Sequence, residues 1–177
     1  QKLPGGLIHV NVVGCALFAA ISGSSAATVA TVGKMSIPEL RKRKYPENIL
    51  LGSLAGSGTL GLLIPPSIIL IIYGVTVQES IAKLFIAGIL PGIMIALIFM
   101  AYVMIWSIIN KKSMPIFYKN YSFTEKVRKS GKLLPVILLI ISVIGSIYTG
   151  IATATEAASL GVVGALILSY FQKSLTI

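Results

Sequence analysis

Charged, metal-binding and disulfide-forming residues are scarce in this sequence. Its 177 residues contain no aspartate, one histidine (His9) and one cysteine (Cys15). The chain therefore lacks both the ligand cluster of a transition-metal site and the cysteine pairs of a disulfide framework. Only 11% of its residues are charged, whereas soluble domains carry about 25%. We expect neither a metal nor an organic cofactor, and an ordinary soluble domain is excluded.

Apolar residues are abundant instead, at 55% of the chain, with a mean hydropathy of +0.92. The net charge of +10 comes from lysines and arginines that cluster between the apolar runs. That distribution follows the positive-inside pattern of membrane proteins and argues against a nucleic-acid partner. We predict an all-α, polytopic integral membrane protein. Because the chain begins with Gln1 and stops shortly after an apolar run, we expect a fragment of a longer polypeptide.

Two short stretches of small and polar residues interrupt the apolar runs, Ile21–Thr28 and Gly56–Ser67. In lipid, every backbone N–H and C=O must be satisfied internally, so a broken helix is tolerated only where protein covers it or it lines a cavity. Paired broken segments are the best sequence signal for a substrate or ion site in a secondary transporter. The remaining segments are interpreted around these two.

The first apolar stretch, residues 7–33 within a segment 5–33, has basic residues on both sides, at Lys2 and from Lys34 onward. Positive charge at both ends favours both ends on the cytoplasmic side. We predict a re-entrant hairpin with helices over about 7–21 and 26–33 and a turn at Ser22–Ser25. The alternative is a simple kinked span.

Residues 34–48 then form a predicted basic loop that contacts anionic lipid headgroups. The next segment, 49–74, contains Gly56, Gly58 and Gly61, which loosen the helix, and Pro65-Pro66, which removes two backbone donors. We predict helices over 49–56 and 67–74, joined by an unwound patch over 57–66. The alternative is a kinked span whose glycines serve helix packing.

Three more segments follow. We predict a transmembrane helix over residues 84–110. Residues 122–149 are predicted to form an interfacial arm that rises into a second transmembrane helix, and residues 150–172 are predicted to form a third transmembrane helix. Thr155 is the predicted cap of the last helix, with Glu156 complementing its N-terminal dipole. Glu156 is also a candidate for a proton or cation role, because a carboxylate beside an apolar run is expensive.

Several motifs together resemble the large membrane (permease) subunit of TRAP transporters, the tripartite ATP-independent periplasmic transporters. The proline-containing motif is the most specific. Ala154 departs from the family, which often has proline there, and the family subunit is much longer, so the resemblance implies its middle portion. The matching pieces are Gly6–Val12, Ser22–Ala26, Gly58–Ser67, Leu84–Gly88 with Pro91–Gly92, and Thr153–Ala158.

The resemblance implies a sodium symporter of the bacterial inner membrane that takes up C4-dicarboxylates, sialic acid or related carboxylates. It implies an elevator mechanism in which the hairpin and the broken helix move together. It also implies two protein partners, a periplasmic substrate-binding protein and a small membrane subunit.

The two interrupted stretches have the chemistry for such a site, since hydroxyls and unwound carbonyls can replace the water around Na⁺. Helix N-termini beside them can face a carboxylate. Neither stretch contains lysine or arginine, so a cation that pairs with the substrate has to come from elsewhere. The candidate sodium ligands are Ser22, Gly23, Ser24, Ser25, Gly56, Ser57, Gly58 and Thr59, and the candidate substrate-lining residues are Thr28, Pro65, Pro66 and Ser67.

Two other functions compete with transport. A scaffold or assembly subunit accounts for the helices but leaves both broken stretches without a purpose. An intramembrane serine hydrolase needs a base near Ser24, and His9 is the only histidine. Along a straight helix His9 lies roughly 18 Å from Ser22, so we expect no enzyme.

Overall fold

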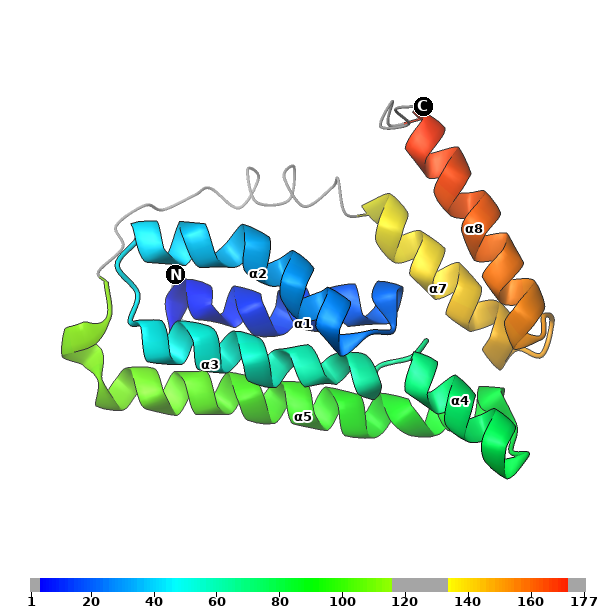
Figure 1. Ribbon diagram of the computed structural model, residues 1–177, viewed down its shortest axis with the longest axis horizontal. Helices are drawn as coiled ribbons and strands as arrows, with labels where there is room; N and C mark the ends of the chain where they lie inside the picture. The colour runs from blue at the N-terminus through cyan, green and yellow to red at the C-terminus, as the bar shows by residue number, and fades with distance from the viewer. Residues whose placement is uncertain (1–3, 116–133, 172–177) are drawn as a thin grey trace. The chain divides into compact units, whose positions relative to one another are not determined.

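The computed structural model describes residues 4–115 and 134–171, and their regular structure is entirely helical. The chain divides into two compact units, Gln1–Tyr118 and Lys119–Ile177. The first contains η1 and α1 to α5, and the second contains α7 and α8 (Figure 1). Two helices, α5 (Ile81–Ile109) and α8 (Ala154–Phe171), are long and apolar enough to cross a membrane. The predicted all-α class is confirmed.

A helical hairpin opens the first unit. After the short 3₁₀ turn η1 (Gly6–Ile8), α1 (His9–Ser22) and α2 (Ser25–Lys42) are joined by Gly23 and Ser24. Gly23 ends α1 with a φ of 59°, a left-handed conformation that favours glycine. Ser24 caps α2, since its hydroxyl accepts a 3.4 Å hydrogen bond from the Ala27 N–H. The turn predicted at residues 22–25 is confirmed.

α2 is longer than predicted. It was expected to end near residue 33 and to be followed by a loop over 34–48, but it continues to Lys42. Pro38 inside it removes only one backbone donor at an exposed position. Leu40, which follows, is 2% exposed and joins the core. Burial of that side chain offsets the weakened helix, and this long-range contact could not be read from the local sequence.

The helix that follows the hairpin is broken, as predicted. α3 (Glu47–Gly58) gives way to the 3₁₀ turn η2 (Thr59–Leu62), and α4 (Ile68–Val77) begins after non-helical residues 63–67. Pro65 and Pro66 lack the N–H groups that a continuous helix needs, and the peptide bond between them is cis. The break falls one or two residues later than the predicted 57–66.

α5 covers the broken helix along its length (Figure 1). It begins three residues before the predicted start at residue 84, because Ser80 caps it and accepts a 3.5 Å hydrogen bond from the Lys83 N–H. Pro91 lies within α5 without ending it, and the short turn η3 (Lys111–Ser113) follows.

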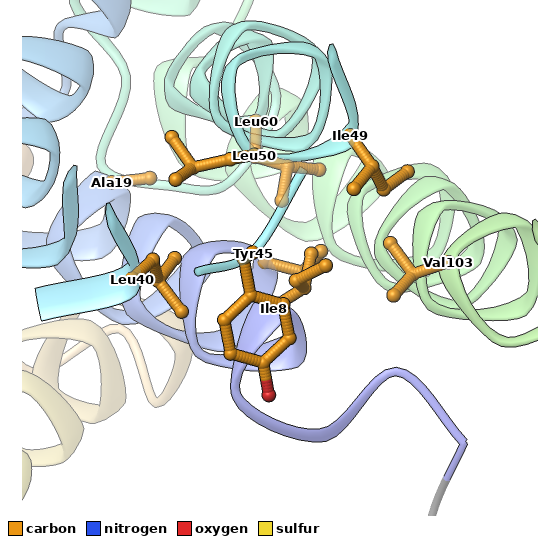
Figure 2. Packing of buried hydrophobic residues seen from close by; sticks show 9 residues of the cluster. Ile8, Ala19, Leu40, Tyr45, Ile49, Leu50, Leu60 and Val103 are labelled. Carbon is orange, nitrogen blue, oxygen red and sulfur yellow. The ribbon is translucent and has the colours of Figure 1, made fainter. Parts of the chain in front are cut away.

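The core of the first unit joins η1, α1, α2, α3, η2 and α5. Figure 2 shows buried side chains converging from these elements and from the loop between α2 and α3. In that loop the Tyr45 hydroxyl accepts a 3.0 Å hydrogen bond from the Leu7 N–H, which ties the loop to the start of the hairpin. The cluster consists of Ile8, Val12, Ala19, Leu40, Tyr45, Ile49, Leu50, Leu60 and Val103.

The second unit pairs α7 (Leu134–Tyr148) with α8 (Ala154–Phe171). Small residues on α8 let the two helices approach, since a Cβ on Gly161 would lie 3.3 Å from Val143. The predicted interfacial arm at the start of 122–149 lies outside the described residues.

Candidate functional site

Three oxygen atoms meet at the tip of the hairpin. The Ser22 Oγ lies 2.9 Å from the Thr28 Oγ1 and 3.2 Å from the Ser24 carbonyl oxygen. The Thr28 hydroxyl donates to the same carbonyl at 2.7 Å. Thr28 is fully buried, whereas Ser22 and Ser24 are half-buried. We call Ser22, Ser24 and Thr28 the tip cluster.

The hairpin tip touches the break in the α3–α4 helix through backbone. The Ile68 N–H donates to the Gly23 carbonyl at 3.2 Å. A Cβ on Gly23 would lie 2.7 Å from the Pro66 oxygen, and one on Gly61 would lie 2.9 Å from the Ser25 nitrogen. The two interrupted stretches of sequence therefore meet, but at Gly61 and at residues 66–68.

The stretch predicted to face the tip, residues 56–59, lies mostly elsewhere. Gly56 faces α5, where its Cβ would lie 3.3 Å from Phe99. The buried Ser57 hydroxyl donates to the Ser53 carbonyl at 2.6 Å, and exposed Thr59 donates to the Gly56 carbonyl at 2.7 Å. Gly58 faces the start of α2, where its Cβ would meet Val29 and lie 3.8 Å from the Ser25 carbonyl oxygen.

Only some of the predicted substrate-lining residues lie at the hairpin tip. Thr28 belongs to the tip cluster, and the Pro66 carbonyl lies against the tip. The fully buried Ser67 hydroxyl donates to the Leu62 carbonyl at 2.8 Å, which closes the turn before α4. Pro65 is buried within the same turn.

Helix α5 also covers the break in the α3–α4 helix. A Cβ on Gly88 of α5 would lie 2.7 Å from the Leu63 carbonyl, and one on Gly92 would lie 3.0 Å from Ile64. Glycine on α5 thus lets unwound backbone approach closely, which is the condition under which a broken helix persists in a membrane. Gly61 was predicted only as a helix breaker, and Gly88 was not predicted to contact the break.

Two helix N-termini lie beside this contact. α2 begins at Ser25 and α4 at Ile68, and the tip and the break join them directly. Residues 10–33 and 48–78 contain no charged side chain. The electrostatics of the site therefore rest on neutral oxygens, which suit a hard cation, and on helix N-termini, which favour an anion.

A second group of polar side chains ties α1 to α3. The fully buried Asn11 amide donates to the Leu50 carbonyl at 3.2 Å and to the Ser53 hydroxyl at 3.0 Å. The Ser57 hydroxyl lies 3.4 Å from the Asn11 carbonyl. This bonding explains why Ser57 faces α1 rather than the hairpin tip.

At the start of α8, Thr153 is the capping residue, which corrects the prediction of Thr155. The Glu156 carboxylate accepts 2.8 Å hydrogen bonds from both the N–H and the hydroxyl of Thr153. In return the Glu156 N–H donates to the Thr153 hydroxyl at 3.3 Å. This is a reciprocal capping box, whose Thr-x-x-Glu spacing was present in the sequence. Glu156 therefore has a structural role.

A hydrolytic site does not assemble around Ser24. His9 is the first residue of α1 and Ser24 follows its end, so a helix of about 21 Å separates them. The His9 Nε2 lies 2.7 Å from the Pro4 carbonyl oxygen instead. Within residues 4–115 and 134–171, no group of three or more potential metal-ligating side chains comes together.

A helical chain with membrane-length apolar helices, and with a hairpin tip packed on a broken helix, belongs to the class of polytopic membrane proteins. More particularly, it belongs to the family described as "Tripartite ATP-independent periplasmic transporter, DctM component", which matches residues 2–177. The family resemblance found in the sequence is confirmed. This family consists of membrane permeases, not enzymes.

Three curated relatives illustrate the match. The chain is 40% identical to the C4-dicarboxylate TRAP transporter large permease protein DctM of Pseudomonas aeruginosa and 39% identical to the sialic acid TRAP transporter permease protein SiaT of Haemophilus influenzae. It is 38% identical to the ectoine/5-hydroxyectoine large permease protein UehC of Ruegeria pomeroyi. The alignments cover 94%, 98% and 93% of this chain but only 38%, 28% and 38% of the relatives.

Proposed function

We propose that this chain forms the sodium-binding hairpin and broken helix of a TRAP permease that imports a carboxylate across the bacterial inner membrane. The carrying observation is the contact between the tip cluster and the break at Gly61 and Ile68. Paired, protein-covered breaks of this kind hold substrate and coupling ions in secondary transporters.

Helix lengths support a re-entrant hairpin. At 1.5 Å per residue, α1 is about 21 Å long and the uncharged part of α2, residues 25–33, about 14 Å, whereas the hydrocarbon core is about 30 Å thick. The C-terminus of α2, the N-terminus of α3 and the C-terminus of α5 lie at one end of the unit (Figure 1). Arg41 and its basic neighbours gather at that end, which we assign to the cytoplasmic side.

The tip cluster is the proposed sodium site. Its three oxygens lie within 3.2 Å of one another, a spacing from which a small cation could be coordinated after the hydroxyls turn outward. Sodium prefers such neutral oxygens when carbonyls and hydroxyls replace its water. Gly58 and Thr59, originally assigned to the site, contribute only if the break rearranges when sodium binds.

The carboxylate is proposed to bind at the N-termini of α2 and α4, beside the sodium ion. Helix N-termini attract anions, and residues 10–33 and 48–78 provide no fixed positive charge. The printed names of the relatives mention C4-dicarboxylate, sialic acid and ectoine, so the substrate is proposed at the level of a carboxylate.

The rest of the transport cycle follows from the family. We propose a periplasmic binding protein that delivers the substrate and a small membrane subunit that completes the permease. The hairpin, α3 and α4 are proposed to move as one body in an elevator-type cycle. The Asn11 contacts and the Gly23–Ile68 hydrogen bond support this, because they hold the hairpin to both halves of the broken helix.

The test uses the full-length transporter, reconstituted with its partners in vesicles. Thr28→Val removes the buried hydroxyl but keeps the side-chain shape. A ligand worth about 1.4 kcal/mol would raise the sodium concentration for half-maximal uptake roughly tenfold. Ser107→Ala, at the distant end of α5, is the matched control and should leave sodium dependence unchanged.

Thr59→Val distinguishes two arrangements of the site. We expect no change in sodium dependence, because the Thr59 hydroxyl is exposed and bonds only the Gly56 carbonyl among the described residues. If Thr59→Val raises the sodium requirement and Thr28→Val does not, the ion lies elsewhere along the break. Uptake that never depends on sodium would refute the proposed sodium site.

A further inference from the structure

A pocket of about 420 Å³ lies beside the start of α8 in the second unit. Its volume is within the range of roughly 300–1,000 Å³ that is typical of small-molecule sites. The contact with α7 uses a neighbouring face of α8, where Gly161 and Gly164 approach Val143 and Leu139. The pocket is therefore accessible to a ligand outside this helix pair. It is lined by Ile151, Ala152, Glu156, Ser159, Leu160 and Val163.

Glu156 supplies the charge of this pocket. It is the only residue with a charged side chain among residues 134–171. Thr153 occupies its Oε2 atom in the capping box, and no described residue donates a hydrogen bond to its Oε1 atom. The Ser159 hydroxyl donates to the Thr155 carbonyl at 3.1 Å and keeps its lone pairs as acceptors. The pocket therefore suits a cation that carries N–H donors.

Apolar side chains continue the pocket along the same face of α8. Leu160 lies one turn beyond Glu156 and Val163 two turns beyond it, and these two apolar residues are 58% and 54% exposed. Along the helix axis Val163 is about 10 Å from Glu156. A polar end followed by an apolar wall of this length matches a phospholipid, with its headgroup at Glu156 and an acyl chain against Leu160 and Val163. The basic side chain of a partner protein would use only the polar end.

Under the topology of the proposed function, the pocket faces the outer leaflet of the inner membrane. In the sequence Lys132 precedes α7 and Lys173 follows α8, so a basic residue stands at the end of each helix away from the turn that joins them. The positive-inside rule assigns these ends to the cytoplasmic side and the turn at residues 149–153 to the opposite side. Glu156, three residues after that turn, then lies near the headgroup level.

We propose that this pocket binds a phospholipid whose headgroup ends in a primary ammonium, as the headgroup of phosphatidylethanolamine does. The ammonium has three N–H donors and bonds the Glu156 Oε1 atom and the Ser159 hydroxyl, and the first of these hydrogen bonds joins two charged groups. The quaternary ammonium of phosphatidylcholine has no N–H and cannot form them. Binding needs neither sodium nor the hairpin tip, so only the assignment to the outer leaflet rests on the proposed function.

The first experiment counts lipids bound to the full-length transporter. The delipidated protein is titrated in mild detergent with phosphatidylethanolamine or with phosphatidylcholine of the same acyl chains, and native mass spectrometry gives the apparent Kd of the bound lipid. The wild type should prefer phosphatidylethanolamine. Glu156→Gln keeps an oxygen for the capping box but removes the charge, so the unfolding midpoint should be unchanged while phosphatidylethanolamine binds at least about tenfold more weakly.

Two further variants serve as checks. Ser159→Ala removes one acceptor, leaves the capping box intact and should weaken phosphatidylethanolamine binding roughly fivefold. Glu79→Gln makes the same chemical change as Glu156→Gln at an exposed position between α4 and α5 and should leave the preference as it is.

A second experiment locates the lipid. A carbodiimide couples an amine to an adjacent carboxylate, so in vesicles of phosphatidylethanolamine it should attach the lipid to Glu156 in higher yield than to exposed Glu79. Mass spectrometry of the two peptides measures both yields within one protein. Ser159→Ala should lower the yield at Glu156 and leave the yield at Glu79 unchanged.

Equal affinity of the wild type for the two lipids would overturn the proposal, as would an unchanged preference in Glu156→Gln or equal coupling at Glu156 and Glu79. If Glu156→Gln releases the small membrane subunit and binds phosphatidylethanolamine like the wild type, the pocket binds protein and the proposal is wrong. Lipids are counted without uptake, so a transporter that fails to use sodium refutes the proposed function and leaves this result readable. Sodium-driven uptake with unselective lipid binding refutes only the lipid pocket.

Discussion

Replacing Gly61 with alanine should disturb the contact between the hairpin tip and the break. The added Cβ would lie 2.9 Å from the Ser25 nitrogen, 3.0 Å from the Ser24 carbonyl carbon and 3.1 Å from the Ser25 Cα. All three are backbone atoms, so no side chain can rotate away. Ordinary contact begins near 3.4 Å, and the hairpin tip must therefore shift by about 0.5 Å. Overpacking of this kind typically costs about 1–3 kcal/mol.

The same shift bears on the proposed ion site, because Ser24 supplies one of the three tip oxygens. We expect Gly61→Ala to lower the midpoint of thermal unfolding of the purified full-length transporter. Saturating sodium should also stabilise the variant less than it stabilises the wild type. The stabilisation by a ligand rises with the logarithm of the ratio of its concentration to its dissociation constant, so weaker sodium binding gives a smaller shift of the midpoint. The assay is a thermal scan with and without sodium.

Gly52→Ala is the matched control, because it makes the same chemical change where a Cβ meets nothing within 4 Å. In the interior of α3 that change should be neutral or stabilising by up to about 1 kcal/mol. Gly23→Ala should resemble Gly61→Ala, since it combines a φ of 59° with a Cβ placed 2.7 Å from the Pro66 oxygen. If Gly61→Ala behaves like Gly52→Ala, the described packing of tip on break is refuted.

Two further substitutions test the supporting structure. Asn11→Asp places an acceptor opposite the Leu50 carbonyl in a fully buried position and should destabilise the transporter by at least about 2 kcal/mol. The control Asn48→Asp changes an exposed side chain and should be nearly neutral. Equal unfolding midpoints for the two variants would contradict the role given to Asn11. Glu156→Gln preserves the capping-box acceptor and should retain uptake, whereas Glu156→Ala should cost α8 about 1 kcal/mol. Loss of uptake with a normal unfolding midpoint in Glu156→Gln would instead indicate a proton or cation role.

Local chemistry explains which parts of the fold could be predicted. The turn at Gly23 and the break at Pro65-Pro66 were predictable, because glycine and proline restrict or release the backbone at their own positions. The Thr153–Glu156 capping box was equally visible in its spacing, although Thr155 was the predicted cap. These features depend on a few neighbouring residues.

The features that were missed depend on tertiary packing. α2 passes Pro38 because Leu40 enters a core built from five other elements. The surface of α3 that faces the hairpin is set by Asn11, which binds Leu50 and Ser53 and turns Ser57 toward α1. The tip therefore meets Gly61 and Ile68 rather than Ser57 and Thr59. No property of residues 56–59 alone encodes this rotation.

The absence of charge near the tip has a consequence for coupling under the proposed function. A carboxylate at the N-termini of α2 and α4 would encounter helix dipoles worth about half a charge each, and no lysine or arginine from residues 10–33 or 48–78. A sodium ion in the tip cluster would supply the missing full charge. At 4 Å and an effective dielectric constant of 20, the attraction between the two ions is about 4 kcal/mol. Because such coupling is reciprocal, each ligand would strengthen the binding of the other, and a permanent lysine at the same place would remove this dependence on sodium.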